Sequence, residues 1–183
     1  MTESSLKERF LAGETFTDFL AKPKKYKELW DALYKRGVVP EAILPRAKTL
    51  HRPWHLLVLS EEWCGDSINT LPLIVRLTEA MVGVDLRILG RDANPDLMDA
   101  HLTGGKSRSI PVIMLLDGDY VEQGWWGPRP RPLQEWVIKE GLAMPKDDRY
   151  REVRTWYARD HGVTTLTELL DLMEESELAT PAA

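Results

Sequence analysis

The chain has 183 residues, of which 43% are apolar and a single one is cysteine, and its net charge is −5. This length suits one domain with a full hydrophobic core, and one cysteine excludes an internal disulfide bond. The negative charge argues against nucleic acid or an anionic membrane as a partner. No apolar run reaches the roughly 18 residues of a membrane span, and the first residues lack a secretory signal, so we expect a soluble cytoplasmic protein.

Residues 1–50 are predicted to be an N-terminal helical extension. Large apolar side chains recur there at the spacing of one helix face. They are Tyr26, Leu29, Trp30, Leu33 and Tyr34. We interpret this stripe as core packing, without a role in stacking on a ligand. Gly37 ends the helix, and a shorter helix from Thr15 to Ala21 is ended by Pro23.

Residues 51–142 alternate between strand and helix patterns. Leu56 to Leu59 form a short continuous apolar run, which is typical of a strand buried on both faces. The further elements are a helix over 66–82, a strand over 84–88, a helix from Asn94-Pro95 to Gly104-Gly105, strands over 112–116 and 120–125, and a helix ending near Leu142. The order β-α-β-α-β-β-α predicts an α/β fold with a mixed central sheet, with the first two strands parallel and the last two antiparallel.

Residues 143–183 are predicted to be a C-terminal extension of two helices that packs on the same compact domain. Gly162 separates the two helices, and Thr164 or Thr165 can cap the second one. We expect the second helix to fray after Glu175.

The residues best suited to chemistry follow the first buried strand. Cys64 lies in the segment Ser60–Ser67, between this strand and the next helix, where open α/β folds place their sites. The unpaired N–H groups at a helix N-terminus favour the thiolate. The carboxylates of Glu61, Glu62 and Asp66 disfavour it. We therefore expect an exposed sulfur with a modestly activated thiol.

Four features of residues 50–142 coincide around this cysteine. They are Trp63-Cys64-x-x-Ser67 at the turn, Pro72 inside the helix, Ile110-Pro111 before the third strand, and Gly127 after the hairpin. In this combination the sequence resembles the thioredoxin-like superfamily, whose motif is Trp-Cys-x-x-Cys with a helix-kinking proline and a cis-proline that faces the thiol. It is most similar to bacterial thioredoxin-like proteins that carry Trp-Cys-Gly-Asp and a Gly-Pro-Arg-Pro segment, here residues 127–130.

The resemblance implies a thioredoxin-like fold over residues 51–142, with extra helices at both ends of the chain. It also implies a cis Ile110–Pro111 bond beside Cys64. By the same analogy, an apolar rim that binds the substrate would surround the cysteine, made of Trp63, Ile110, Pro111 and Trp126. Trp125 and Trp126 are consecutive on a strand, so we expect only one of them to face the core.

Two departures from the family pattern bear on function. Ser67 stands where a dithiol oxidoreductase has its resolving cysteine, so a mixed disulfide on Cys64 needs an external thiol for its release. We expect the Ser67 hydroxyl to assist by donating to the thiolate. Val58 occupies the position of the buried acid that thioredoxins carry on this strand, and His55 is interpreted as a packing residue rather than a proton shuttle.

Arg129 is a further candidate, because its loop is expected to approach the site. Its guanidinium can offset the nearby carboxylates or hold the carboxylate of a small thiol. The alternative is a solvated or ion-paired arginine between two prolines. The four histidines show no ligand spacing with Cys64, and the segment 104–107 lacks the spacing of a phosphate loop, so we expect neither a metal nor a cofactor.

Two functions remain open from the sequence. The first is monothiol thiol–disulfide exchange by Cys64 and Ser67 with a low-molecular-weight thiol or a protein disulfide as the partner. The second is a non-catalytic thioredoxin-fold module, in which Trp63 and Trp126 hold an extended peptide by strand pairing. A peroxidase has no specific support in the residues. The substrate and the oligomeric state are not indicated.

Overall fold

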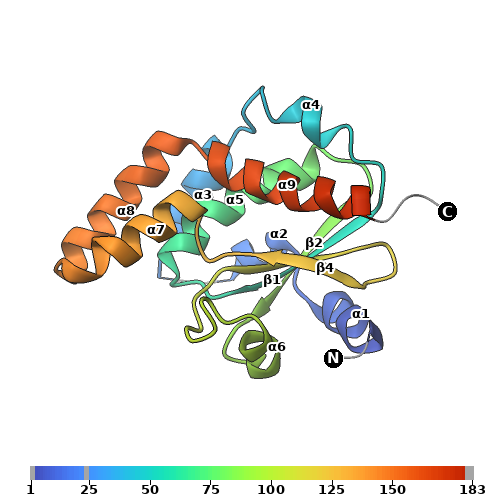
Figure 1. Ribbon diagram of the computed structural model, residues 1–183, viewed down its shortest axis with the longest axis horizontal. Coiled ribbons are helices and arrows are strands. Elements are labelled where there is room, and N and C mark those ends of the chain that lie inside the picture. The colour runs from blue at the N-terminus through green and yellow to red at the C-terminus, as the bar shows by residue number, and fades with distance from the viewer. Residues whose placement is uncertain (1–2, 23–24, 180–183) are drawn as a thin grey trace.

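A computed structural model describes residues 3–22 and 25–179 of the chain (Figure 1). Within these residues, the helices before the first strand are α1 (Glu3–Ala12), α2 (Phe16–Ala21), α3 (Lys27–Arg36) and α4 (Leu44–Ala47). The central elements are β1 (Trp54–Ser60), α5 (Gly65–Glu79), β2 (Val84–Gly90), α6 (Pro95–Ala100), β3 (Val112–Leu116), β4 (Glu122–Trp126) and α7 (Arg131–Lys139). A 3-10 turn (Gly141–Ala143) leads to α8 (Lys146–Asp160) and α9 (Val163–Ala179). The helix stop predicted at Pro23 lies outside the described residues.

The four strands form one sheet in the order β2-β1-β3-β4. β1 pairs in parallel with β2, as expected for two strands connected through the helix α5. β1 and β3 are antiparallel, and so are β3 and β4, which form the predicted hairpin. The predicted α/β fold with a mixed central sheet is therefore confirmed.

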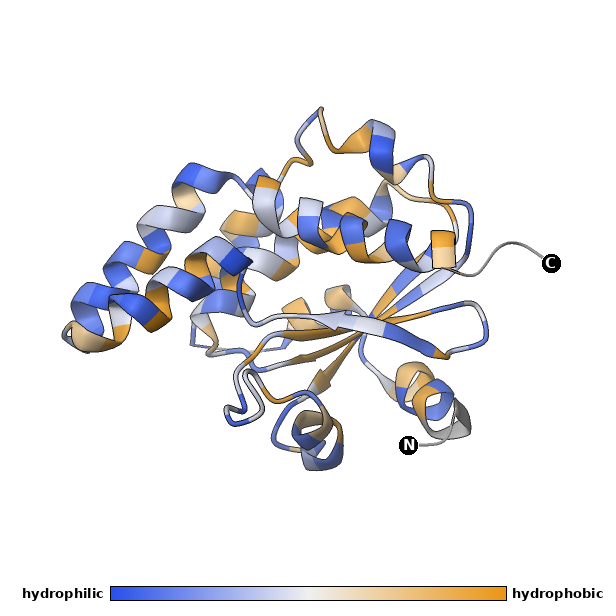
Figure 2. Ribbon diagram, in the orientation of Figure 1, coloured by the Kyte–Doolittle hydropathy of each residue, from blue (hydrophilic) through white to orange (hydrophobic). Residues whose placement is uncertain are grey.

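Helices cover both faces of this sheet (Figure 1). The larger core lies on the face of α5 and α9, where Trp30 of α3 and Leu71 of α5 are fully buried. The opposite face carries a second core, to which α1 and α6 contribute Phe10 and Leu97. This double cover explains the continuous apolar run in β1, because both of its faces are buried. Figure 2 shows apolar residues concentrated in the central strands, while the outer helix α8 is mostly hydrophilic.

Several predicted boundaries are wrong, and a local hydrogen bond explains one of them. α5 ends at Glu79, so Val82 lies outside the helix and is 97% exposed. α6 ends at Ala100, well before the glycine pair at 104–105. The N-terminus of α9 is capped by Asp160, whose carboxylate accepts from the Thr164 N–H at 3.1 Å, and neither threonine acts as the cap. α9 also continues past Glu175 to Ala179, rather than fraying there.

Helix α9 is fastened to the rest of the fold by carboxylates. Glu168 accepts from the Trp126 indole N–H at 2.7 Å and from the Arg131 backbone N–H at 2.8 Å, which caps α7. Glu177 accepts from the backbone N–H of Arg52 at 3.1 Å and from the Trp54 indole at 3.3 Å, next to the start of β1. Among the described residues, no helix is both long and apolar enough to cross a membrane.

Candidate functional site

The turn between β1 and α5 places Cys64 directly before the first residue of a helix. Cys64 is the N-cap residue of α5, and its sulfur accepts from the Ser67 backbone N–H at 3.5 Å. Trp30 of α3 is completely buried and donates from its indole to the Glu62 carbonyl at 3.0 Å, which holds this turn from outside. The predicted position of the cysteine at the carboxyl end of β1 is therefore confirmed.

The expected exposed sulfur is wrong, because Cys64 is only 6% exposed. Its thiol donates to the carbonyl oxygen of Ile110 at 3.2 Å, in the segment that leads into β3. The Ser67 side chain beside it is fully buried, and its hydroxyl makes no hydrogen bond in this structure. The cysteine is thus held as a thiol between the start of α5 and the loop before β3.

The pKa of Cys64 is raised above its ordinary value, not lowered. Burial is the largest cause, and the negative charge of Asp66 adds to it. The nearby Ser67 hydroxyl and the backbone N–H groups of Asp66 and Ser67 work in the opposite direction and are outweighed. The helix N-terminus therefore favours the thiolate, as predicted, but desolvation decides the direction of the shift.

Asp66 is more central to the site than the sequence predicts. It was predicted to be only one of several nearby acids, yet it is 6% exposed and forms a salt bridge with Arg129 at 2.6 Å. The Tyr157 hydroxyl of α8 donates to the same carboxylate at 3.0 Å. Arg129 also donates to the Gln134 side chain at 2.9 Å. The loop of Arg129 approaches the site as expected, and its guanidinium offsets one of the nearby carboxylates by pairing with Asp66. Because it already has these partners, it is the ion-paired arginine of the alternative interpretation and is not free to hold the carboxylate of a small thiol.

This buried cluster changes the ionisation of its members. Burial raises the pKa of Asp66 despite the opposing effects of Arg129 and Tyr157. The pKa of Tyr157 is raised well above its ordinary value, by burial first and then by the Asp66 carboxylate. Glu61, by contrast, turns away and accepts from the Asp92 N–H at 3.0 Å. The local charge that Cys64 experiences is therefore that of Asp66.

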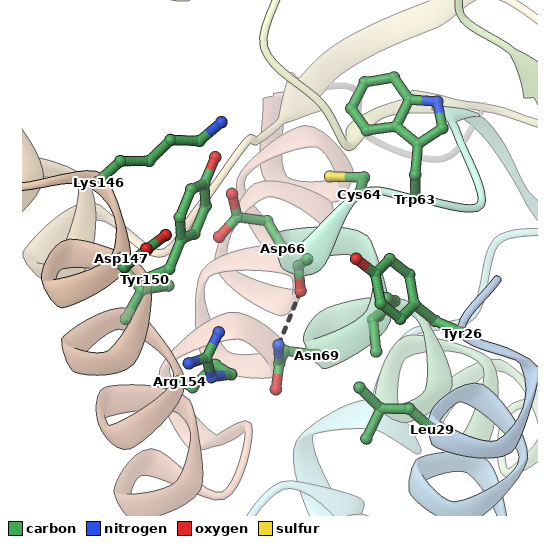
Figure 3. A pocket seen from close by; sticks show the side chains of 13 residues that line it. Tyr26, Leu29, Trp63, Cys64, Asp66, Asn69, Lys146, Asp147, Tyr150 and Arg154 are labelled. Carbon is green, nitrogen blue, oxygen red and sulfur yellow. Dashed lines mark hydrogen bonds between the residues drawn. The ribbon is translucent and has the colours of Figure 1, made fainter.

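A pocket of about 570 Å³ opens beside the cysteine, between helices from distant parts of the chain. Figure 3 shows Tyr26 and Leu29, from the start of α3, across from Lys146, Tyr150 and Arg154 on α8. Cys64 and Asp66 lie between these two walls, at the start of α5, and Trp63 lies above Tyr26 in this view. The interpretation of the helix 27–36 stripe as core packing holds for Trp30 but is wrong for Tyr26 and Leu29, which are 38% and 42% exposed.

The predicted apolar rim is only partly present. Trp63 is 48% exposed, with the Arg91 guanidinium 5.0 Å from its ring centroid, and it lines the pocket with Cys64. Ile110 and Pro111 are buried, and the peptide bond between them is cis. Trp126 is 5% exposed and packs in the larger core, so it is not part of a rim. Ser67, Ile110, Pro111, Trp126 and Arg129 do not line the pocket.

The two tryptophans of β4 do not divide as predicted. Trp126 packs in the core on the α5 and α9 face, and Trp125 packs against the core on the opposite face. Both have a core to contact because helices cover both faces of the sheet. Gly127, directly after them, has φ +138°, and a Cβ there would lie 2.1 Å from the Pro111 carbonyl oxygen. Only glycine therefore fits where the hairpin meets the loop before β3.

Two of the four histidines serve packing and pairing. The His55 ring stacks on Tyr120 at a centroid distance of 4.1 Å, as predicted for a packing residue. His101 is 2% exposed and bonds through Nε2 to Glu122 at 2.7 Å. Within the part of the chain that the structure describes, no group of three or more His, Cys, Asp or Glu side chains could hold a metal ion.

Comparison with known proteins gives a family and a fold. A family model described as thioredoxin matches residues 13–147. A crystal structure of an HIV epitope scaffold superposes with a TM-score of 0.71 at 20% identity, covering 92% of this chain and 97% of that chain. A protein of unknown function from Pseudomonas aeruginosa superposes with a TM-score of 0.70 at 20% identity, covering 93% and 97%. No curated protein sequence matches the chain.

Proposed function

Because the chain belongs to the thioredoxin family, we propose that it exchanges disulfides through the single thiol of Cys64. The observation that carries this proposal is the position of Cys64, which caps α5 and lines a pocket large enough for a small molecule. The Trp-Cys-Gly-Asp segment and the Cys-x-x-Ser spacing support the same assignment. Cys64 is the nucleophile, and the hydroxyl of the nearby Ser67 can donate to its thiolate.

The exchange proceeds in two balanced steps. The Cys64 thiolate attacks one sulfur of the substrate disulfide, a mixed disulfide forms, and the other sulfur leaves as a thiolate. An external thiolate then attacks the substrate sulfur of the mixed disulfide, and Cys64 leaves as a thiolate. The second thiol must come from outside, since the chain has one cysteine. A thiol used in this way is suited to a reducing compartment such as the cytoplasm.

Because the pKa of Cys64 is raised, we expect its attack on a disulfide to be slow at neutral pH. At neutral pH most of the protein carries the protonated thiol, hydrogen-bonded to the Ile110 carbonyl. Attack therefore requires that the thiol loses its proton and leaves this hydrogen bond. A thiolate formed at a high pKa is a strong nucleophile, which partly compensates for its low abundance.

The test is exchange with a small disulfide, followed by mass spectrometry of the intact protein. We expect one mixed disulfide on the wild-type chain and none on Cys64→Ala. The control is Ser67→Ala, which keeps the thiol and removes the hydroxyl, and which should slow adduct formation without abolishing it. A wild-type chain that forms no adduct would exclude this function.

A non-catalytic binding module is the second candidate, and the burial of Cys64 is the observation that favours it. A buried, protonated thiol that donates to a carbonyl is a stable packing group. Under this alternative, a partner binds the pocket equally well when Cys64 is replaced by alanine. The adduct experiment separates the two candidates, because only the exchange function requires the sulfur to react.

A further inference from the structure

The walls of the pocket beside Cys64 limit the substrate of the proposed exchange reaction. Its volume of about 570 Å³ falls within the range of roughly 300–1,000 Å³ that is usual for small-molecule sites. The sulfur itself is 6% exposed, so a disulfide held in a folded protein would have to pass between α3 and α8 to reach it. A small disulfide inside the pocket meets no such barrier.

The pocket gathers apolar surface that the fold leaves uncovered. Among the described residues, the large apolar side chains that are more than a third exposed include four in this pocket. These four are Tyr26, Leu29, Trp63 and Tyr150. The aromatic rings approach the pocket from three separate elements, which is typical of a surface that contacts the apolar part of a ligand (Figure 3).

The side chains that line the pocket carry more unpaired positive charge than unpaired negative charge. Lys146 and Arg154 line it from α8, and in the described structure neither takes part in a salt bridge. The pocket also contains two carboxylates. Asp66 is ion-paired with Arg129, so Asp147 is the one other carboxylate in the lining that faces the two cations. In a chain with a net charge of −5, this is a locally positive site that attracts an anion.

We propose that the pocket binds a small thiol, presented as its disulfide, that carries an apolar group and an anionic group. This inference rests on the proposed exchange function and specifies its substrate. The disulfide lies against Cys64, the apolar group contacts Tyr26 and Tyr150, and the anionic group pairs with Lys146 or Arg154. The sulfur chemistry is the two-step exchange described above, with this small molecule as the substrate disulfide.

Two probe disulfides test the charge directly, since each releases a product that is measured by its absorbance for every molecule of Cys64 that reacts. Dithiobis-nitrobenzoate is aromatic with two negative charges, and dithiodipyridine is aromatic and neutral. We expect the double variant Lys146→Ala/Arg154→Ala to react with the dianionic probe about tenfold more slowly, the effect of two exposed ion pairs together. Its rate with the neutral probe should change by less than about twofold, because Cys64 itself is unaltered.

The matched control is Arg159→Ala, which removes a cation from the same helix outside the pocket. It should leave both rates unchanged. An equal change in both rates for the double variant, or no change in either, would overturn the anionic substrate while leaving exchange by Cys64 intact. A wild-type chain that reacts with neither probe would instead overturn the exchange function itself. Formation of a mixed disulfide between Cys64 and a protein such as insulin, at a rate matching the dianionic probe, would overturn the restriction to small substrates.

Discussion

Asp66 beside Cys64 and His101 beneath the β-hairpin are both buried titratable groups with an oppositely charged partner, but their surroundings differ. Asp66 is bound by Arg129 and Tyr157 and forms part of the pocket wall next to the only thiol. His101 bonds to Glu122 and to the Leu97 carbonyl, and the Trp125 ring lies 5.6 Å away. The first cluster raises the pKa of a nucleophile, while the second joins α6 to β4.

The comparison shows that burial and a charged partner do not by themselves identify a functional group. Asp66 differs from His101 because it lines a pocket together with a cysteine. The same physical forces act on both pairs, so both should respond to substitution. Only changes in the Asp66 cluster should also alter the reactivity of Cys64.

The largest effect is expected from Arg129→Met. This change leaves the Asp66 carboxylate buried without its cation, so the free energy of unfolding at neutral pH should fall by about 3–5 kcal/mol. Urea denaturation measures the loss. The double variant Arg129→Met/Asp66→Asn should recover most of it, because an amide needs no counter-ion. A double variant as unstable as the single one would show that packing of the arginine stem, and not the ion pair, is what matters.

A smaller effect is expected from Glu122→Gln, and it should depend on pH. Burial lowers the pKa of His101, but the hydrogen bonds to Glu122 and Leu97 outweigh this and raise it above 6.5. The stability that this pair contributes is therefore complete below the unfolded pKa and is lost as the pH rises through the folded pKa. Glu122→Gln should cost about 1.5 kcal/mol near pH 6 and much less near pH 9.

The check on this prediction is urea denaturation of both chains across this pH range. If Glu122→Gln destabilises equally at both ends of the range, the interaction does not involve a protonated imidazole. The free energy of unfolding should also decrease more between pH 6 and pH 9 in the wild-type chain than in Glu122→Gln, because only the wild-type chain loses the pair.

The third prediction concerns reactivity, where the change is smallest. Asp66→Asn removes the negative charge that raises the pKa of Cys64, so this pKa should decrease, although burial keeps it above its ordinary value. Alkylation rates measured against pH give the pKa directly. Asp147→Asn removes a second carboxylate of the pocket that does not contribute to the shift, and it should leave the profile unchanged. An unshifted profile in Asp66→Asn would show that the charge of Asp66 does not contribute to the raised pKa of Cys64.

The sequence predicts the parts of this protein that depend on neighbours along the chain. The apolar run of β1, the turn before α5 and the hairpin of β3 and β4 all follow from short local patterns. Cys64 was therefore found, together with its position at a helix N-terminus. The helix ends at Glu79 and Ala100 were missed because no capping residue marks them in the sequence.

The parts that depend on distant contacts were not predictable in the same way. Asp66 meets Arg129 and Tyr157, which lie 63 and 91 residues further along the chain. The burial of Cys64 and the raised pKa of its thiol follow from that packing. Tyr26 and Leu29 have the spacing of core residues, and only the position of α8 reveals that they face a pocket instead. Trp126 was misassigned because its partner Glu168 lies on a helix that follows much later.

Glu177 near the end of α9 has a mechanical consequence. Its carboxylate accepts from the backbone N–H groups of His51 and Arg52 and from the indole of Trp54, at 3.1 to 3.3 Å. A pulling force applied at the end of α9 would therefore reach the first residue of β1 through one side chain. Since β1 is a central strand of the sheet, a load on that strand is shared with both of its neighbours. The end of the last helix is thus tied by hydrogen bonds to a strand in the middle of the sheet.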